Sequence, residues 1–261
     1  MRIALTIAGS DSGGGAGIQA DLKTFQRFGV FGTTAITAVT AQNTRGVDAW
    51  EPVSTALVRA QIDAVISDLP PAAAKSGMLA NAAIAMTVAG AIRDNSLRNY
   101  VLDPVMVATS GDVLLEQDAI AAIRRELLPL ATLVTPNLEE AGILTDRTLE
   151  DEDAMVEAAE ILVNEMGAQA ALIKGGHLPG DRVIDILYDG DVRVFRSRRL
   201  ETANTHGTGC TLSAAIAAQL ANGESLHAAV RRSIDYVHNA IATAPGLGGG
   251  HGPLNHLAAD S

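Results

Sequence analysis

The chain is poor in cysteine, in aromatic residues and in positive charge. Its 261 residues include one cysteine, Cys210, and 3% aromatic side chains. A single cysteine excludes an internal disulfide and fits a reducing compartment. Lysines and arginines number 19 against 30 acidic residues, so the net charge is −11. Nucleic acids and anionic membranes both select a basic face, and the sequence predicts neither as a main partner.

Long apolar runs are absent as well. The most apolar stretches, such as Ala82–Ile92, are much shorter than the roughly 20 residues that cross a bilayer. The first apolar segment, Ile3–Ala8, runs directly into a glycine-rich loop and lacks the core and the cleavage pattern of a signal peptide. The sequence therefore predicts a soluble, cytoplasmic protein.

Short apolar runs alternate with segments of helical period along most of the chain. This alternation predicts an α/β fold with a mostly parallel central sheet and helices on both faces. Buried strands are expected at Ile3–Ala8, Ala35–Val39, Tyr100–Leu102, Leu133–Val134 and Ala170–Ile173. Helices are expected at Ile18–Phe28, Ala56–Ser67, Ala82–Ile92, Gln117–Leu128, Glu152–Met166, Thr211–Ala221 and Ser225–Thr243.

A β-hairpin is predicted in the last third of the chain. Two strand-like runs, Arg182–Tyr188 and Val192–Phe195, flank the dipeptide Asp189-Gly190, which is typical of a tight hairpin turn. Neither a linker nor an internal repeat divides the sequence. We expect residues 1–261 to form one domain.

The first glycine-rich loop, Gly9–Gly17, follows a strand and precedes a helix. Its end, Gly15–Ala20, satisfies the dinucleotide-binding pattern G-x-G-x-x-[GA]. However, the loop is too long for the tight turn of that motif, and no acidic residue follows the second strand near Thr40. A flexible turn is the alternative interpretation. A Walker A loop is excluded, because no glycine in the chain precedes a lysine.

The second glycine-rich segment, Asn204–Thr211, leads into an apolar helix. Its glycines would let backbone N–H groups surround an anion at the helix N-terminus, although simple close packing is an equally good explanation. Cys210 falls in the first turn of this helix. A lone cysteine on an apolar helix is usually inert core, but a helix N-terminus stabilises the thiolate, which would let Cys210 accept a proton.

Polar residues follow three of the predicted strands. Asp103 ends one strand, and Asn137 and Glu140 follow the next one. These side chains suit Mg²⁺ or its bound waters at the carboxyl edge of the sheet. Asp103 as a turn residue, and Asn137 with Glu140 as a helix capping box, are the structural alternatives. Lys174 closes a further buried strand before two glycines, and we expect it to contact phosphate.

Segments along nearly the whole chain match one family in the family's own order. They are Ala8–Thr24, Ala41–Thr44, Lys75–Leu79, Asp103–Met106, Thr135–Asn137, Lys174–His177, Asn204–Thr211 and Gly249–Leu254. The chain resembles the ribokinase-like superfamily and, within it, the hydroxymethylpyrimidine/phosphomethylpyrimidine kinases of thiamine biosynthesis. This resemblance implies a ribokinase-like fold with a small β lid or edge, ATP as phosphoryl donor, Mg²⁺, an aminopyrimidine substrate and a homodimer.

The resemblance also implies roles for individual residues. The substrate would be bound by Gly9, Asp21, Gln42, Met78 and Val105, with Asp21 and Gln42 as hydrogen-bond partners. Lys174, Asn137 and Thr208 would bind ATP, and Asp103, Asn137 and Glu140 would hold Mg²⁺, largely through water. Gly207, Gly209 and the amide of Cys210 would form the anion hole, and the Cys210 thiolate would be the base.

Two positions depart from the family pattern. Thr40 stands where an apolar residue is common, and Thr109 stands where lysine is frequent. The stretch Val47–Val53 is expected to cover the site as a lid. Two other functions remain open from sequence: a pyridoxal or pyridoxine kinase, and a non-catalytic nucleotide- or pyrimidine-binding protein.

Overall fold

The computed structural model describes residues 1–106 and 117–259. Its strands form one nine-stranded sheet in the order β3-β2-β1-β4-β5-β6-β7-β8-β9. The six strands from β2 to β7 in this order are parallel, and β3, β8 and β9 extend the two edges with antiparallel pairs. The strands are β1 Ile3–Ser10, β2 Phe31–Asn43, β3 Gly46–Pro52, β4 Ala73–Ser76, β5 Tyr100–Leu102, β6 Leu133–Val134, β7 Ala171–Lys174, β8 Arg182–Tyr188 and β9 Val192–Arg198.

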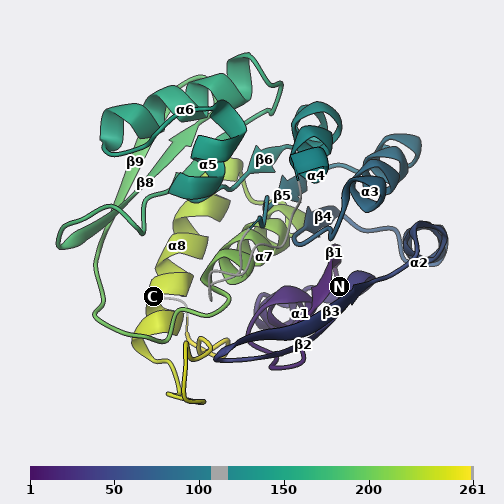
Figure 1. Ribbon diagram of the computed structural model, residues 1–261, viewed down its shortest axis with the longest axis horizontal. Helices are drawn as coiled ribbons and strands as arrows, with labels where there is room; N and C mark the ends of the chain where they lie inside the picture. Colours follow the sequence, from purple (N-terminus) through teal and green to yellow (C-terminus); the bar gives the residue numbers. More distant parts are fainter. Residues whose placement is uncertain (107–116, 260–261) are drawn as a thin grey trace.

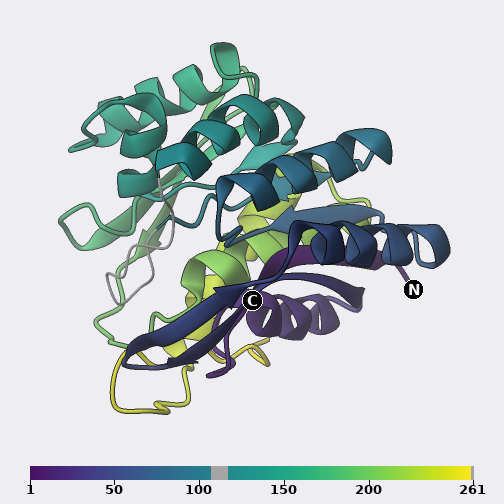
Figure 2. The ribbon, with the colours of Figure 1, turned by 45° about the vertical axis from the view of Figure 1, so that its right-hand side comes forward.

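Helices cover both faces of the sheet (Figures 1 and 2). One face carries α1, α7 and α8, which pack against one another, and the other carries α2 to α6. The helices are α1 Gly17–Arg27, α2 Thr55–Asp68, α3 Ala82–Asp94, α4 Gln117–Ala122, α5 Leu138–Thr145, α6 Glu152–Asn164, α7 Thr208–Ala221 and α8 Leu226–Ala242.

Two hydrophobic clusters, one on each face of the sheet, hold these layers together. Val58, Ile84 and Leu162 belong to the cluster under α2, α3 and α6, and Phe25 and Ile216 belong to the cluster under α1 and α7. All five side chains are at most 1% exposed. Parallel strands buried on both faces read as continuous apolar runs, and this explains why most of them were visible in the sequence.

The structure confirms the mostly parallel α/β fold and the hairpin, whose second strand continues to Arg198. The stretch expected as a lid is mostly the edge strand β3, paired with β2, and its Val47 lines the cavity; that it covers the site as a lid stays a prediction. Strand β4 was missed because Lys75 and Ser76 interrupt its apolar run, although all four of its residues are buried. The helix expected at Gln117–Leu128 is α4 followed by a π-helical turn at Ile123–Leu127. That the chain is one domain stays a prediction.

The topology brings the carboxyl ends of β1, β4, β5, β6 and β7 to one edge of the sheet, which is where open α/β sheets bind ligands. The N-terminus of α7 reaches the same region and packs against β1, β4 and β5. Within the described residues, no helix is long and apolar enough to span a membrane.

Candidate active site

A cavity of about 650 Å³ opens at the carboxyl ends of the parallel strands. It is lined by segments that are far apart in the sequence, from the glycine loop after β1 to helix α8. Every predicted site residue except Asp21 lines it: Gly9, Gln42, Met78, Val105, Asp103, Asn137, Glu140, Lys174, Gly207, Thr208, Gly209 and Cys210. The structure therefore brings together residues that sequence analysis had linked only through a resemblance.

The glycine loop after β1 is folded around the carboxylate of Asp11. Its Oδ1 accepts the N–H of Gly13 at 2.7 Å, and its Oδ2 accepts those of Gly15 at 2.9 Å and Ala16 at 2.8 Å. The Nε2 atom of His206 lies 2.9 Å from the same Oδ2. Burial alone would raise the pKa of Asp11, but these hydrogen bonds outweigh it and the pKa is lowered. Asp11 thus ties the first glycine loop to the second.

The second glycine loop ends at Gly207, which has φ +80° and is the N-cap of α7. A Cβ at this position would collide with the Gly15 carbonyl oxygen, so only glycine fits. The N–H groups of Thr208 and Thr211 donate to Thr205 and Gly207 carbonyls. Those of Gly209 and Cys210 in the same first turn have no helical acceptor. This end of α7 faces the cavity, and an N-terminal turn of this kind is suited to binding an anion.

Cys210 lies in the first turn of α7 and is partly buried. Burial raises the pKa of its thiol to about 11, and the carboxylates of Asp103 and Asp21 add to this effect, while Lys75 opposes it. The sequence-based expectation that the helix N-terminus would favour the thiolate is therefore wrong for the ligand-free site. Desolvation of the buried thiol is the largest cause, and together with the two carboxylates it outweighs the lowering effect of Lys75.

A group of charged side chains occupies the centre of the cavity. The Nζ atom of Lys174 lies 3.1 Å from Asp103 Oδ1 and 3.9 Å from Glu140 Oε2. Asp103 is 1% exposed, and its carboxylate also accepts hydrogen bonds from the hydroxyls of Thr135 and Ser213. Burial alone would lower the pKa of Lys174, but the two carboxylates raise it, so this lysine is a cation. A Cβ at Gly209 would lie 3.1 Å from its Nζ, which places the ammonium beside the anion-binding turn.

Asn137 and Glu140 form the capping box of α5, as the structural alternative predicted. The Asn137 side chain accepts the Glu140 N–H at 2.9 Å, and Glu140 Oε2 accepts the Asn137 N–H at 2.8 Å. Burial raises the pKa of Glu140 to about 7, with Asp103 adding to the effect and Lys174 opposing it. Two buried carboxylates that share one lysine are short of positive charge.

This shortage of positive charge fits a hydrated divalent cation. Mg²⁺ takes oxygen ligands and usually keeps several of its waters, and the carboxylates of Asp103 and Glu140 both face the cavity. The Asn137 side-chain oxygen is occupied by the capping box, so any contact with the ion would run through water. No cluster of three or more His, Cys, Asp or Glu side chains suited to direct metal binding occurs in residues 1–106 and 117–259.

The end of the cavity nearest β2 is formed by Gly9, Gln42, Met78 and Val105, the residues expected to bind the substrate. Thr40 lies there too, and its hydroxyl donates to the Ser10 carbonyl at 2.8 Å. The threonine hydroxyl is thus satisfied, and it adds no unpaired polar group to this wall. Thr109 lies outside the described residues.

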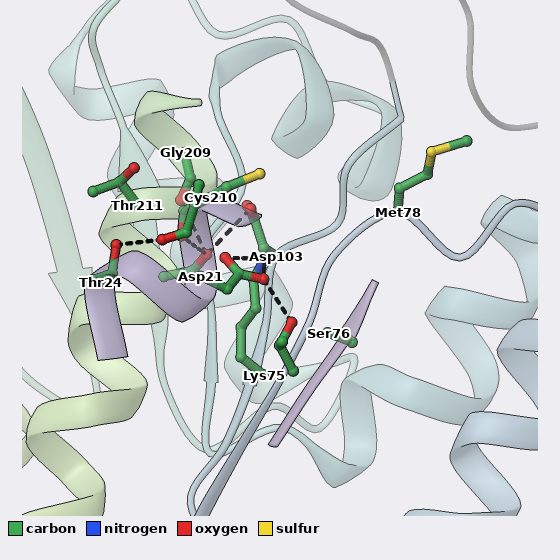
Figure 3. Close-up of polar contacts among 12 residues, drawn as sticks. Asp21, Thr24, Lys75, Ser76, Met78, Asp103, Gly209, Cys210 and Thr211 are labelled. Carbon is green, nitrogen blue, oxygen red and sulfur yellow. Dashed lines mark hydrogen bonds and ion pairs between the residues drawn. The ribbon is translucent and has the colours of Figure 1, made fainter. Parts of the chain in front are cut away.

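Asp21 is the one predicted site residue that does not line the cavity. Its carboxylate accepts hydrogen bonds from Lys75 Nζ at 3.0 and 3.1 Å and from the Thr6 hydroxyl at 2.6 Å, and it is 0% exposed. The side chain lies behind Lys75, which does border the cavity (Figure 3). In this structure Asp21 is the counter-ion of a buried lysine, and its role in substrate binding stays a prediction.

Sequence analysis missed three further residues that line the cavity. Asp185 of β8 accepts the Gly175 N–H at 3.0 Å, and burial raises its pKa to about 6. Arg199 donates to the carbonyls of Gly176 and Gly180 and so holds the loop after β7. His206 was included in a quoted motif without a role. An aspartate in the middle of the apolar run Arg182–Tyr188 was the one available signal.

Comparison with known proteins identifies the family. A family model described as phosphomethylpyrimidine kinase matches residues 11–255. The chain belongs to this family. It is 55% identical to the hydroxymethylpyrimidine/phosphomethylpyrimidine kinase of Rhizobium meliloti (strain 1021), over 98% of this chain and 97% of that protein. It is 49% identical to the protein of the same name from Bacillus subtilis (strain 168), over 98% of this chain and 94% of that one.

A solved pyridoxal kinase has nearly the same fold. The ADP complex of the Bacillus subtilis pyridoxal kinase superposes with a TM-score of 0.91 at 40% sequence identity, covering 99% of this chain and 98% of that one. Membership of the phosphomethylpyrimidine kinase family confirms the resemblance inferred from the motifs and makes the chain a phosphotransferase.

Proposed function

We propose that this protein uses ATP to phosphorylate 4-amino-5-hydroxymethyl-2-methylpyrimidine and then phosphorylates the resulting monophosphate to the diphosphate. The observation that carries this proposal is the position of Lys174 and the first turn of α7 at the middle of one cavity. A cation and free backbone N–H groups at that point suit a phosphoryl group in transfer between ligands bound at the two ends.

In the first step, the hydroxymethyl oxygen attacks the γ-phosphorus of ATP. The new O–P bond forms while the bond from this phosphorus to the β,γ-bridging oxygen breaks, and its electron pair leaves with ADP. The hydroxyl proton passes to the Cys210 sulfur, in the small fraction of molecules that hold it as thiolate, and is later released to water. Gly207, Gly209 and the amide of Cys210 would stabilise the transferred group.

In the second step, the nucleophile is a phosphate oxygen of the monophosphate. Because the second pKa of a phosphate monoester is about 6, this oxygen is ionised near neutral pH and needs no base. The same positioning and charge neutralisation therefore suffice for both steps, since phosphoryl transfer passes through a loose transition state. This explains how one cavity with a weakly ionised thiol serves two reactions.

Asp103 and Glu140 are the residues that would hold Mg²⁺, with Asn137 in contact through water. The ion would neutralise charge on the ATP phosphates. Lys174 would contact the phosphate directly. Support for the cation comes from the geometry, since the buried carboxylates of Asp103 and Glu140 share the single ammonium group of Lys174 at 3.1 and 3.9 Å.

The end of the cavity under α8 would bind the nucleoside part of ATP. Its wall is largely apolar, and this suits a flat base; the residues are Val183, Leu200, Leu212, Ile234, Val237 and Ile241. Thr208 borders the same space at the start of α7. The ADP complex of the Bacillus subtilis pyridoxal kinase, a structural neighbour, supports nucleotide binding.

Pyridoxal is the second candidate substrate, and the structural similarity to a pyridoxal kinase favours it. The higher identity to the pyrimidine kinases supports the pyrimidine as the main substrate.

We also propose a cytoplasmic homodimer. Val39 and Trp50, which are 54% and 37% exposed on the β2–β3 edge pair, are candidates for its interface.

A product assay tests the proposed function. The protein is incubated with ATP, with and without Mg²⁺, and with the hydroxymethylpyrimidine, its monophosphate or pyridoxal, and the mono- and diphosphates are separated. We expect both pyrimidine phosphates to form and pyridoxal to react more slowly. If ATP is consumed but none of the three compounds is phosphorylated, the protein has another acceptor. If no ATP is consumed with any of them, the result favours a non-catalytic binder.

A further inference from the structure

Lys75 is a buried cation at the floor of the cavity. No part of its side chain is open to solvent, yet it borders the cavity below Cys210. It is one of three lysines in a chain of net charge −11, and neither phosphorylation step as proposed uses it. Lys75 begins the motif Lys75–Leu79, and no phosphate contact explains why a lysine stands there.

The ammonium group of Lys75 is held in place from several sides. Both oxygens of Asp21 lie within 3.1 Å of Nζ, and a Cβ at Gly77 would lie 2.9 Å from it. Burial alone would lower the pKa of Lys75, but Asp21, Cys210 and Asp103 raise it, so the group stays charged. A lysine that is fixed in this way cannot turn into the cavity, and it acts as a permanent positive charge.

This charge lies close to Cys210. Helix α7, which carries Cys210 in its first turn, packs against β4, which carries Lys75. Figure 3 shows Lys75, Asp21, Asp103 and Cys210 gathered together, with Met78 pointing away from them. The other cation acting on the Cys210 sulfur is Lys174, and the nearby anions are Asp21 and Asp103.

Buried ion pairs are costly to desolvate, and replacing them with apolar residues is often neutral or stabilising. A stability role alone is therefore a weak reason for a lysine–aspartate pair next to the cavity. In the first phosphorylation a negative charge passes through this region: it moves from the Cys210 sulfur to the attacking oxygen as the proton is transferred, and on to the phosphoryl group and ADP as the new O–P bond forms. A fixed charge in a dry site acts strongly on such a group.

We propose that Lys75 is a positioning residue for the first phosphorylation, acting as a fixed cation that offsets the negative charge shared by Cys210 and the attacking hydroxymethyl oxygen. Asp21 holds the ammonium in place and does not bind the ring. The inference rests on the proposed function. It predicts an unequal effect on the two steps, because the monophosphate brings its own ionised nucleophile.

The test compares the two steps in Lys75→Met and in the neutral pair Lys75→Met with Asp21→Asn. The readout is the ratio of first-step kcat to second-step kcat, with melting temperature as a folding check. Removing one preorganised hydrogen-bond donor typically costs about 10² to 10³ in kcat. Lys75 does not touch the reacting atoms and acts on them through Cys210, so its effect should be smaller. We expect the ratio of first-step to second-step kcat to fall about 10- to 100-fold in both variants. The double variant leaves no unpaired buried charge, so its melting temperature should be higher than that of Lys75→Met. Its ratio of first-step to second-step kcat should stay low.

Two further variants separate charge from packing. Asp21→Asn alone keeps the cation and one oxygen that can accept a hydrogen bond from it, and it removes a nearby negative charge, so its ratio should not fall. Tyr100→Phe removes the buried 2.6 Å hydrogen bond to Ser76, the next residue of β4, and does not touch the cavity; its ratio should match the wild type. The first-step pH profile gives a second readout, and its rise with pH should move to higher pH in Lys75→Met.

A ratio within about twofold of the wild type in the neutral pair would overturn the proposal, as would equal loss of both steps. If neither Lys75 variant folds, the Lys75–Asp21 ion pair has a structural role in the core, and the proposal is overturned as well. If the wild-type protein does not phosphorylate the pyrimidine at all, the proposed function itself fails, which is a different result from an active wild type with an unchanged ratio.

Discussion

Replacing Cys210 with alanine tests whether a thiol of such high pKa is the base of the first step. The pKa is about 11, so at pH 8 the thiolate makes up about one part in a thousand. A well-placed general base contributes at most about 10⁴-fold. The product of the two numbers gives about a 10-fold advantage at pH 8, which should increase about 10-fold for each further pH unit.

The assay measures kcat for each step from pH 7 to pH 9.5 in the wild type and in Cys210→Ala. Because of this pH dependence, we expect the variant to lose about 10-fold in the first step at pH 8 and about 100-fold at pH 9, with a second step that stays within about twofold. Cys210→Ser is the matched control, because its hydroxyl keeps the volume and the hydrogen bonding but does not ionise in this range. Parallel pH profiles in all three proteins, or equal losses in both steps, would refute a base role.

Three other substitutions test the remaining parts of the site. Lys174→Ala removes a charge-assisted phosphate contact worth about 1.5–3 kcal/mol, so kcat/KM for ATP should fall roughly 10- to 100-fold while the KM of the pyrimidine changes little; unchanged ATP kinetics would reduce Lys174 to a structural role. Glu140 has a raised pKa of about 7, so its contribution to stability is present below about 4.5 and is lost as pH rises through 7. Glu140→Gln should therefore lose less melting temperature than the wild type between pH 5 and pH 8.5, by several degrees at about 2–4 °C per kcal/mol, and should need more Mg²⁺ for activity; an identical pH dependence would show that ionisation of this buried carboxyl does not destabilise the fold. Asp11 has a lowered pKa, so its contribution is present above its ordinary value of 3.8 and is lost in acid. Asp11→Asn should cost about 1–3 kcal/mol at pH 7 and almost nothing at pH 2, as measured by urea unfolding.

Most of the fold followed from the sequence, because parallel strands covered on both faces leave clear apolar runs. Strands β3 and β4 were not predicted, and of these β4 contains the buried Lys75; nothing local signals that a distant Asp21 pairs with it. A pattern of apolar residues finds elements that are buried for hydrophobic reasons. It does not find an element whose charge is compensated across 54 residues of sequence.

Site residues were predictable as a set, whereas their electrostatics were not. The resemblance led to residues that line one cavity, since strand ends and helix starts in this topology meet at one edge. The pKa of Cys210 depends on how deeply the thiol is buried and on the carboxylates around it. Both are properties of tertiary structure, so a helix-start argument from sequence predicted the wrong direction.

The three lysines show how an acidic chain prepares a phosphate site. Each ammonium already has an oxygen partner: Lys23 donates to the Gly14 carbonyl at 2.6 Å, Lys75 pairs with Asp21, and Lys174 pairs with Asp103. In the proposed function, Asp103 would need another cation once Lys174 contacts a phosphate, and a divalent ion brought with the nucleotide would supply one. Binding of the phosphate and binding of the ion would then support each other, because each would release the partner that the other needs. With few cations in the chain, the empty site stays short of positive charge, and this shortage is what a bound divalent ion would relieve.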